Sequence, residues 1–539
     1  MKLKIALAQT NPTLGDLAGN AEQIIALAQQ ATQAGAALLI TPELSLCGYP
    51  PEDLALRSDF YDENARVLAD LASRLPPDLA VVVGYPLREG ERFYNAAALL
   101  RSGGIAAIYR KQILPNHSVF DEVRTFVAGD EARVFDCAGL RFGINICADI
   151  WEAGTATQAS EAGAQILLVL NASPFHAGKQ AERLAVARER IAECGLPLVY
   201  VNMTGGQDEL VFDGASFVLD AQGALCAQCP AFAAGLHLIE FDALQPSGVI
   251  TPLPEDDALI YQALVMGVRD YVSKNGFPGV LVGSSGGIDS ALTLTIAVDA
   301  IGADRVQAVM MPSQFTADMS LEDAQQLALN LGIRYDIQPI KLMFDIFMSE
   351  LSDEFNNLPF DQTEENIQAR VRGVILMALS NKFGQLVLTT GNKSEMASGY
   401  ATLYGDMAGG FAVLKDVAKT RVWRLARYRN QLGDPTMPLI PERIITRPPT
   451  AELRANQCDQ DSLPPYEILD AIMQAYVEHD KAPRDIIAAG FQAADVHKVI
   501  GLIDRSEYKR RQSPPGIRIT PRGFGRDRRY PITHKYRAP

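Results

Sequence analysis

Short runs of Val, Ile and Leu alternate with helix-like segments along most of the chain, and this alternation constrains the fold more than any other feature. Short apolar runs bounded by turn-forming residues are typical of buried strands. Two of the helix-like segments, Ala18–Ala34 and Ala181–Glu193, are followed by a glycine that suits a left-handed helix end. The strands predicted in the first half are Lys4–Ala8, Ala36–Ile40, Leu79–Val83, Ile105–Tyr109, Phe142–Ile146, Ile166–Leu170 and Leu198–Val201. The pattern favours an α/β fold.

A proline-rich segment divides the chain. With 539 residues, the chain is too long for a single hydrophobic core. From about Phe241 to Glu255 the sequence reads FDALQPSGVITPLPE, and its three prolines and lack of a clear period indicate a linker. We therefore expect one domain at residues 1–242, a linker at 243–256 and a second domain at 257–539.

The second half repeats the pattern of strand, loop and helix. A helix is predicted at Asp256–Lys274, a strand at Gly279–Val282 and a further helix from about Ser290. This order predicts a doubly wound parallel sheet. The later predicted elements are Arg305–Met310, Leu321–Leu331, Tyr335–Ile340, Glu364–Phe383 and Leu386–Thr389. The tail after Arg505 is rich in Arg and Pro and shows no periodicity.

Charge and composition exclude several classes of protein. The net charge of -15 argues against non-specific binding of DNA or RNA. No stretch reaches the length of a membrane span without a charge or a turn former, and the N-terminus reads as a strand rather than a signal peptide. The seven cysteines are an odd number and predict no disulfide framework, so we expect a reducing cytoplasm. Cys226 and Cys229 form a CxxC, but no second pair stands at the spacing of a zinc site.

Three reactive side chains of the first half each follow a predicted strand. They are Glu43, Lys111 and Cys147. Side chains at the carboxyl ends of neighbouring strands can converge on one pocket. A thiol needs a base, which a carboxylate can supply, and an ammonium group can stabilise an oxyanion. Each residue also has a plain alternative, because a strand-end Cys often only packs, a Glu after Thr-Pro often lies in a turn, and a strand-end Lys is often solvated.

The segments around these residues resemble a known family. PELSLCGYPPEDL, RKQILPNHSVFDEVRTF and GINICADIWE resemble the nitrilase, or carbon–nitrogen hydrolase, superfamily, and the resemblance covers roughly residues 2–240. It implies a four-layer αββα sandwich. It also implies that Glu43 is the general base, Lys111 the oxyanion stabiliser and Cys147 the nucleophile.

The same resemblance implies a set of glutamine contacts. NASPFHAGK is similar to the substrate-binding stretch of glutamine-using members, with Ser173 and Lys179 as contacts. Glu122 resembles the further acidic residue beside the lysine, although it could equally be an ordinary helix-start Glu. His117 is assigned to the glutamine site too, but His117 and Ala148 stand where the family more often has a Tyr and a Glu. The details of glutamine contact therefore depart from the family pattern.

The first motif of the second half that suggests chemistry is a Gly/Ser loop with the sequence Val282-Gly-Ser-Ser-Gly-Gly-Ile-Asp-Ser290. Glycines allow a tight turn, and backbone N–H groups at a helix start bind anions. The loop lacks the G-K-[ST] of a Walker A motif and the G-x-G-x-x-G of dinucleotide-binding folds. SGGIDS resembles the pyrophosphate loop of ATP pyrophosphatases, which split ATP into AMP and pyrophosphate. The implied ATP contacts are Gly283, Ser284, Ser285, Gly286, Gly287, Ile288, Asp289, Ser290 and Thr390.

Later segments suggest what ATP activates. QLVLTTGNKSEMASGY, RPPTAELRANQCDQDSLPPYEILD and SEYKRRQSPPG resemble NAD synthetases over about residues 257–539. With a nitrilase-like first half, the chain resembles the glutamine-dependent NAD synthetases. This implies that glutamine is hydrolysed to ammonia, that ATP adenylates deamido-NAD with release of pyrophosphate, and that ammonia displaces AMP to give NAD. The resemblance also implies a homo-oligomer with paired synthetase domains.

The resemblance further implies contacts with deamido-NAD at Asn366, Glu395 and Lys509. In-line attack on phosphorus needs charge neutralisation, so Mg²⁺ is expected, with Asp289 and Glu395 as candidate ligands. Asp289 could instead be a helix cap and Glu395 a helix-start residue. Lys419 could meet a phosphate or be an exposed helix lysine.

Two other functions remain open at this point. GMP and asparagine synthetases also combine a pyrophosphate loop with glutamine, but their glutaminase domains are of other types. A catalytically dead, ligand-sensing scaffold is the alternative outside enzymes. The intact Glu43, Lys111, Cys147 and SGGIDS argue against it.

Overall fold

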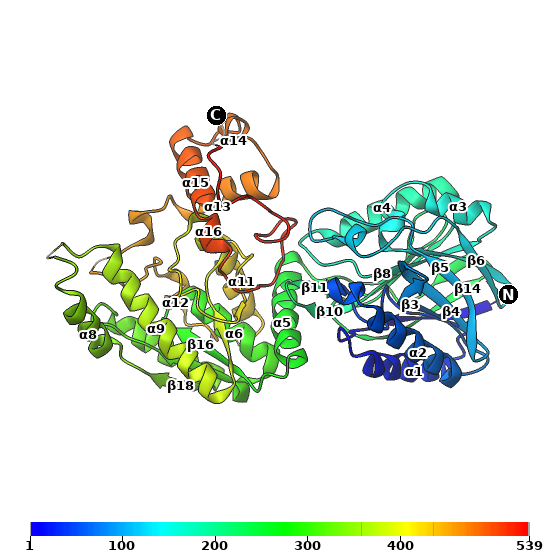
Figure 1. Cartoon of the computed structure of the whole chain (residues 1–539), viewed down its shortest axis with the longest axis horizontal. Helices are drawn as coiled ribbons and strands as arrows, with labels where there is room; N and C mark the ends of the chain where they lie inside the picture. The colour runs from blue at the N-terminus through cyan, green and yellow to red at the C-terminus, as the bar shows by residue number, and fades with distance from the viewer. Residues whose placement is uncertain (1, 357, 435, 456, 537–539) are drawn as a thin grey trace. The chain divides into compact units, whose positions relative to one another are not determined.

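The chain divides into two compact units, Met1–Glu255 and Asp256–Pro539 (Figure 1). The structure is a computed structural model that describes residues 2–356, 358–434, 436–455 and 457–536. Within these described ranges, no helix is long and apolar enough to cross a membrane.

The first unit contains two large sheets and one small hairpin. One sheet has the order β15-β14-β1-β2-β3-β4-β5 and the other β13-β12-β9-β8-β7-β6, while β10 pairs with β11. The strands of the first sheet are β1 (Lys2–Gln9), β2 (Leu38–Ile40), β3 (Ala80–Glu89), β4 (Arg92–Arg101), β5 (Gly104–Arg110), β14 (Gly235–Asp242) and β15 (Gln245–Ser247). The others are β6 (Arg133–Cys137), β7 (Leu140–Ile146), β8 (Ile166–Asn171), β9 (Leu198–Asn202), β10 (Thr204–Gln207), β11 (Leu210–Asp213), β12 (Phe217–Leu219) and β13 (Leu225–Gln228).

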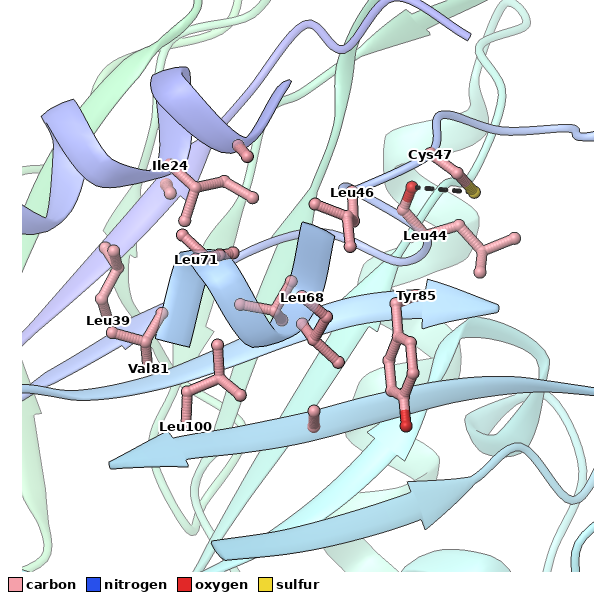
Figure 2. Close-up of a cluster of buried hydrophobic side chains, with 14 of the residues drawn as sticks. Ile24, Leu39, Leu44, Leu46, Cys47, Leu68, Leu71, Val81, Tyr85 and Leu100 are labelled. Carbon is pink, nitrogen blue, oxygen red and sulfur yellow. Dashed lines mark hydrogen bonds between the residues drawn. The ribbon is translucent and has the colours of Figure 1, made fainter. Parts of the chain in front are cut away.

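Alternation along the strands separates an inner core from two outer cores. Leu38 and Ile40 of β2 lie in the core between the two sheets, whereas Leu39 packs outward. Figure 2 shows this outer core, in which side chains such as Leu68 and Leu71 pack against the sheet. The helices of the unit are α1 (Leu17–Gln33), α2 (Ser58–Arg74), α3 (Thr155–Glu161) and α4 (Lys179–Cys194), with the short helices η1 (Glu52–Leu56), η2 (Glu122–Arg124) and η3 (Cys147–Ile150).

These helices complete a four-layer arrangement. Helices α1 and α2 cover the outer face of the first sheet. Helices α3 and α4 cover the outer face of the second sheet, where Ala156 and Ile191 pack with Leu167. The αββα sandwich that the nitrilase resemblance implies is therefore confirmed.

Several segments of this unit differ from the sequence-based expectation, among them the unpredicted strands β6, β10, β11, β12, β13 and β14. β4 was not predicted, because its run of small apolar residues follows a polar turn and gives only a weak strand signal. The expected linker is also partly regular, since β15 pairs antiparallel with β14, with Pro246 opposite Phe241. Proline is compatible with an edge strand, where the missing N–H costs no ladder hydrogen bond.

The second unit is built on a sheet of parallel strands in the order β18-β17-β16-β19-β20. The order reverses between β16 and β19, which defines a topological switch point at which ligands bind in doubly wound folds. The doubly wound parallel sheet is thus confirmed. The strands are β16 (Val280–Ser284), β17 (Val306–Met310), β18 (Arg334–Ile337), β19 (Leu386–Thr389) and β20 (Phe411–Ala412).

Helices pack on this sheet and continue beyond it. Helices α6 and α9 pack on β16, and α7 packs on β17 and β18. A separate core joins α10 to the later helices α13 and α15, with Ala397, Leu469 and Ile500 at its centre. The main helices are α5 (Asp256–Lys274), α6 (Ile288–Ile301), α7 (Asp318–Leu331), α8 (Lys341–Leu351), α9 (Gln362–Phe383), α10 (Lys393–Ser398), α11 (Lys419–Gln431), α12 (Glu442–Thr446), α13 (Tyr466–Met473), α14 (Pro483–Ala488), α15 (Ala493–Arg505) and α16 (Glu507–Arg510).

Candidate functional sites

The first unit buries an ion-paired cluster at the ends of three strands. Glu43 follows β2, Lys111 follows β5, and Cys147 begins η3 after β7; all three are buried. The Lys111 Nζ donates hydrogen bonds to Glu43 Oε1 at 2.6 Å and to the two carboxylate oxygens of Glu122 at 2.8 and 2.9 Å. The structure therefore brings Lys111 together with both glutamates. Its burial excludes the interpretation of Lys111 as a solvated strand-end lysine.

Three further groups hold the two glutamates, and the sequence did not single them out. Asn95 of β4 donates from Nδ2 to Glu43 Oε1 at 2.7 Å, and the N–H of Ala172 donates to Glu43 Oε2 at 2.9 Å. The Tyr49 hydroxyl donates to Glu122 Oε1 at 2.8 Å. Asn95 is a lone Asn beside the apolar run of β4. This polar residue could have been noticed in the sequence if β4 had been predicted as a strand.

The electrostatics of the cluster favour an ammonium beside a protonated thiol. Burial alone lowers the pKa of Lys111, but the carboxylates of Glu122 and Glu43 outweigh it and raise the pKa above its usual value. Burial, followed by the charge of Glu43, raises the pKa of Cys147 well above its usual value, although Lys111 opposes this. The thiol therefore needs a base before it can act as a nucleophile.

The turn at Cys147 is unusual for a residue with a side chain. Its φ is 43°, in the left-handed region that favours glycine. Cys147 borders the core between the sheets and also interacts electrostatically with Glu43 and Lys111. Strained backbone of this kind is often retained at functional sites, although it does not by itself distinguish a nucleophile from a packing residue.

The remaining predicted glutamine contacts occupy different surroundings. Ser173 is buried, and its Oγ accepts a hydrogen bond from Arg183 Nε at 3.1 Å. The Lys179 Nζ lies 3.9 Å from the centroid of the Trp151 ring and interacts electrostatically with Cys147. His117 lies on an exposed loop. Ser173 follows Ala172, whose N–H donates to Glu43, and Lys179 lies beside Trp151, which ends η3 of Cys147. Among the described residues, no contact joins His117 to the cluster.

In the second unit, the Gly/Ser loop joins β16 to α6. Gly286 has a φ of 73°, and a Cβ there would meet the carbonyl oxygen of Ser320 at 2.3 Å, so only glycine fits. The Ser290 hydroxyl donates to the carbonyl of Gly287 at 3.0 Å and lies 3.1 Å from the Ser285 hydroxyl. The loop thus stands at the amino end of α6, where backbone N–H groups can bind anionic oxygens.

A cavity of about 270 Å³ opens over this loop. It extends from β16 and β19 to α10, α11 and the segment 447–453. Of the residues predicted to contact ATP, deamido-NAD or metal, it is lined by Gly283, Ser284, Ser285, Gly287, Ile288, Asp289, Ser290, Thr390 and Glu395. Gly286 does not line it, and instead packs its backbone against Ser320.

Asp289, Glu395 and Lys419 form a charged group in this cavity. The Lys419 Nζ donates to Asp289 Oδ2 and lies 4.0 Å from Glu395 Oε1. Lys419 is buried, so the interpretation of it as an exposed helix lysine is wrong. Gly287, and not Asp289, is the N-cap residue of α6, and the Asp289 carboxylate accepts instead from Lys419 and from Asn392 Nδ2 at 2.9 Å.

Glu395 does stand in the first turn of a helix, as its plain alternative expects, and it forms a capping box with Asn392. Its Oε2 accepts from the N–H of Asn392 at 3.2 Å, and its own N–H donates to Asn392 Oδ1 at 3.0 Å. Its Oε1 faces Lys419. Burial, and then the charge of Asp289, raises the pKa of Glu395 well above its usual value, while Lys419 lowers it.

The donor set fits a magnesium ion that is shared with phosphate. Within the part of the chain that the structure describes, no group of three or more His, Cys, Asp or Glu side chains is arranged to hold a metal. Mg²⁺ is commonly bound by one or two carboxylates, with substrate phosphates and water completing its shell. Asp289 and Glu395 provide two carboxylates in the cavity of the Gly/Ser loop.

Asn366 and Lys509 lie outside the cavity lining but contact one turn beside it. The Thr402 hydroxyl donates to Asn366 Oδ1 at 2.7 Å. The Lys509 Nζ donates to the carbonyl oxygens of Gly399 and Ala401 at 2.7 and 2.8 Å. The two residues thus flank the turn 399–402, whose Tyr400 does line the cavity.

Comparisons with known proteins match both units and the whole chain. The carbon–nitrogen hydrolase family matches residues 4–245, and the NAD synthase family matches residues 260–513. A glutamine-dependent NAD(+) synthetase of Acinetobacter baylyi is 51% identical over 539 residues, which cover 99% of each chain.

The chain belongs to the glutamine-dependent NAD(+) synthetases. A relative from Thermotoga maritima with the same activity is 43% identical and matches 100% of both chains. A structure of the glutamine-dependent NAD(+) synthetase of Acinetobacter baumannii in complex with adenosine diphosphate is 48% identical, with a TM-score of 0.81 over 100% of both chains. That of Cytophaga hutchinsonii, at 21% identity and a TM-score of 0.85 over 99% of this chain and 98% of the other, supports the fold.

Membership of the glutamine-dependent NAD(+) synthetases fixes the reaction. The enzyme is an ATP-dependent ligase that hydrolyses glutamine, adenylates deamido-NAD and amidates it to NAD. ATP is a substrate. The alternatives of a GMP or asparagine synthetase and of a catalytically dead scaffold are therefore excluded.

Proposed function

We propose that Glu43, Lys111 and Cys147 release the ammonia. Glu43 takes the thiol proton as Cys147 Sγ attacks the amide carbon of glutamine, and Lys111 stabilises the oxyanion. Glu43 returns the proton to the leaving ammonia, and water then hydrolyses the thioester to glutamate. The observation that supports this assignment is the buried bridge from Lys111 to Glu43 at 2.6 Å. Substitution of Cys147 tests it, because added ammonium bypasses this step.

We assign the glutamine substrate to contacts with Glu122, Ser173, Lys179 and His117. Support differs among them. Glu122 joins the Lys111 ion pair, Ser173 follows Ala172, whose N–H donates to Glu43, and Lys179 lies beside Trp151. For His117 the support is the family resemblance alone.

We assign the adenylation step to the cavity of the Gly/Ser loop. The nicotinate carboxylate of deamido-NAD attacks the α-phosphorus of ATP, pyrophosphate leaves, and ammonia then displaces AMP from the adenylate. Residues 283–290 and Thr390 bind ATP, while Asn366, Glu395 and Lys509 contact deamido-NAD. Backbone N–H groups at the start of α6 and the ammonium of Lys419 favour an anion in this cavity.

Asp289 and Glu395 are the proposed ligands of Mg²⁺. When bound, the ion neutralises phosphate charge during in-line attack. The Lys419 ammonium balances the charge of both carboxylates, because its Nζ contacts Asp289 and lies 4.0 Å from Glu395. Asp289 and Glu395 would hold the metal, and Lys419, which lines the same cavity, would face phosphate.

Glu395→Gln is expected to weaken metal use. The amide keeps the size of the side chain but removes one of the two carboxylates, so we expect the Mg²⁺ concentration for half-maximal synthesis to rise roughly 10-fold. The measurement is NAD formation from ammonium across a Mg²⁺ titration. Glu322→Gln, on the exposed face of α7, is the matched control. An unchanged Mg²⁺ requirement would remove Glu395 from the metal site.

We also propose that the enzyme is a homo-oligomer that pairs through α8 and α9. These helices lie beside one another (Figure 1). Both expose large apolar side chains. Large exposed apolar patches mark interfaces, and a self-complementary patch suits a two-fold dimer. The patch comprises Leu342, Ile346, Phe347, Val374, Met377 and Phe383.

Ile346→Glu is expected to break this pairing. The side chain is 55% exposed, so the monomer tolerates the charge, whereas a paired interface would bury it. We expect Ile346→Glu to sediment with a lower coefficient than the wild type. The melting temperature should stay unchanged, because the cores of the two units are not altered. An unchanged sedimentation coefficient in Ile346→Glu would contradict pairing through this face.

For the domain bounds we propose residues 1–242 for the glutaminase and 257–539 for the synthetase. The division of the chain between Glu255 and Asp256 supports the start of the second domain.

A further inference from the structure

One buried carboxylate of the first unit belongs to neither the ion-paired cluster nor the assigned contacts. Asp149 lies two residues after Cys147 and has no exposed surface. Its Oδ1 accepts from the backbone N–H groups of Gln112 and Ile113 at 2.9 and 2.8 Å. Its Oδ2 accepts from the N–H of Ile146 at 2.8 Å and from the Tyr109 hydroxyl at 2.7 Å.

These partners surround two of the assigned catalytic residues. Tyr109 and Gln112 flank Lys111, and Ile146 directly precedes Cys147. Lys111 follows β5 of one sheet, whereas Cys147 follows β7 of the other. No strand ladder joins the two segments, so their spacing must be set by side chains between the sheets.

The hydrogen bonds also show which form of Asp149 the site needs. All four partners are donors, three N–H groups and one hydroxyl, and an ionised carboxylate accepts from all of them. Burial raises the pKa of Asp149, but the hydrogen bonds from the N–H groups of Ile113 and Ile146 and from the Tyr109 hydroxyl oppose this rise because they favour the ionised form. Because both oxygens are engaged, Asp149 is not placed to exchange a proton with glutamine. Its role is therefore to hold backbone rather than to react.

We propose that Asp149 is a positioning residue that sets the distance between Lys111 and Cys147. Its carboxylate fixes the chain on both sides of Lys111 and the residue before the strained turn of Cys147. The inference rests on the proposed roles of Lys111 and Cys147. It accounts for how a thiol on one sheet meets an ammonium group on the other.

Asp220 offers a matched control in the same unit. It is also a buried aspartate that accepts from two backbone N–H groups, those of Gln222 and Ala224, at 2.9 and 2.8 Å. These two groups lie in its own turn, and its Oδ2 accepts from Gln245 Nε2 of β15 at 3.5 Å, so none of these partners belongs to the segments of Lys111 or Cys147. Asp220→Asn therefore removes a buried carboxylate that does not connect the segments of Lys111 and Cys147.

The test is Asp149→Asn, which keeps the size but turns an –NH₂ group toward donors. Displacement of reacting groups by about 1 Å can cost roughly 100-fold in rate, so we expect a loss of that order in kcat with glutamine. NAD synthesis from ammonium should stay near the wild-type rate. Tyr109→Phe, which removes one donor and leaves the carboxylate, should give a smaller loss in the same direction. Asp220→Asn should change neither activity.

Alkylation of Cys147 by iodoacetamide provides a second measurement. Burial and the charge of Glu43 raise the pKa of Cys147, and the Lys111 ammonium opposes this rise, so moving Lys111 away should shift the pH dependence of alkylation in Asp149→Asn to higher pH. If Asp149 only stabilises the fold, Asp149→Asn should lower the melting temperature and leave the pH dependence of Cys147 alkylation unchanged.

Three results would overturn the proposal. They are an unchanged kcat with glutamine, a parallel loss of both activities with the melting temperature, and an unshifted alkylation profile. If Asp149→Asn does not fold, the same measurements on Tyr109→Phe decide. A failure of the proposed function is distinct, because glutamine use would then survive in Cys147→Ala, whatever Asp149→Asn shows.

Discussion

Replacement of Cys147 by alanine is expected to abolish NAD synthesis from glutamine and to leave synthesis from ammonium near the wild-type rate. Without the thiol no thioester forms, and no other thiol was assigned to the cluster of Glu43 and Lys111. The substitution leaves at most a small cavity, so the first unit should stay folded. The second unit contains none of these residues. The measurement is NAD formation from each nitrogen source, with a thermal melt beside it.

Companion variants make this result specific. Glu43→Gln and Lys111→Ala should give the same split, because each disables the same step. Cys137→Ala is the matched control, since Cys137 is also a buried thiol of the first unit and packs in the core between the sheets. If Cys147 only packs, Cys147→Ala should behave like Cys137→Ala. Retained glutamine use would mean that the nucleophile is another residue.

Asp289→Asn is expected to lower the rate of adenylation roughly 100-fold or more. Losses of this size follow when one preorganised electrostatic group is removed from a site. The amide keeps the size of the side chain, but it removes a proposed metal ligand and turns –NH₂ toward Lys419, which donates to Asp289 in the native protein. The helix should survive, because Gly287 is the N-cap residue of α6.

The rate of pyrophosphate release from ATP, with deamido-NAD and ammonium present, measures this loss. Asp304→Asn, at an exposed position of the same unit, is the control and should keep the wild-type rate. Alkylation of Cys147 in Asp289→Asn should be normal, since the first unit is unchanged. A wild-type rate of pyrophosphate release in Asp289→Asn would remove Asp289 from the site.

The sequence revealed the assigned catalytic residues because each stands at the end of an apolar run. Glu43, Lys111 and Cys147 follow predicted strands, which chain-local patterns can locate, and the resemblance of the segments around them to the nitrilase superfamily supplied their roles. Asn95 and Asp149 were missed for a different reason. Asn95 acts across the sheet from β4, and Asp149 acts between sheets, so their roles depend on which strands become neighbours.

Lys419 shows the same limit in the second unit. Its helix, α11, has no side-chain cap of its own at Ala418. Instead, Ser394 Oγ accepts from the Lys419 N–H, and Asp470 accepts from the N–H of Thr420, each at 2.9 Å. These caps come from α10 and α13, which are distant in sequence. The local sequence therefore could not show that Lys419 begins a helix with its side chain buried beside Asp289.

The relation between the two chemistries is tested most directly by one ratio, that of NAD formed from glutamine to NAD formed from ammonium. It should be compared in Cys147→Ala and Asp289→Asn under identical conditions. We predict that the ratio falls to near zero in Cys147→Ala. In Asp289→Asn both rates should fall together, so that the ratio stays at the wild-type value. An unchanged ratio in Cys147→Ala would contradict the assignment of ammonia release and NAD formation to separate sets of residues in the two units.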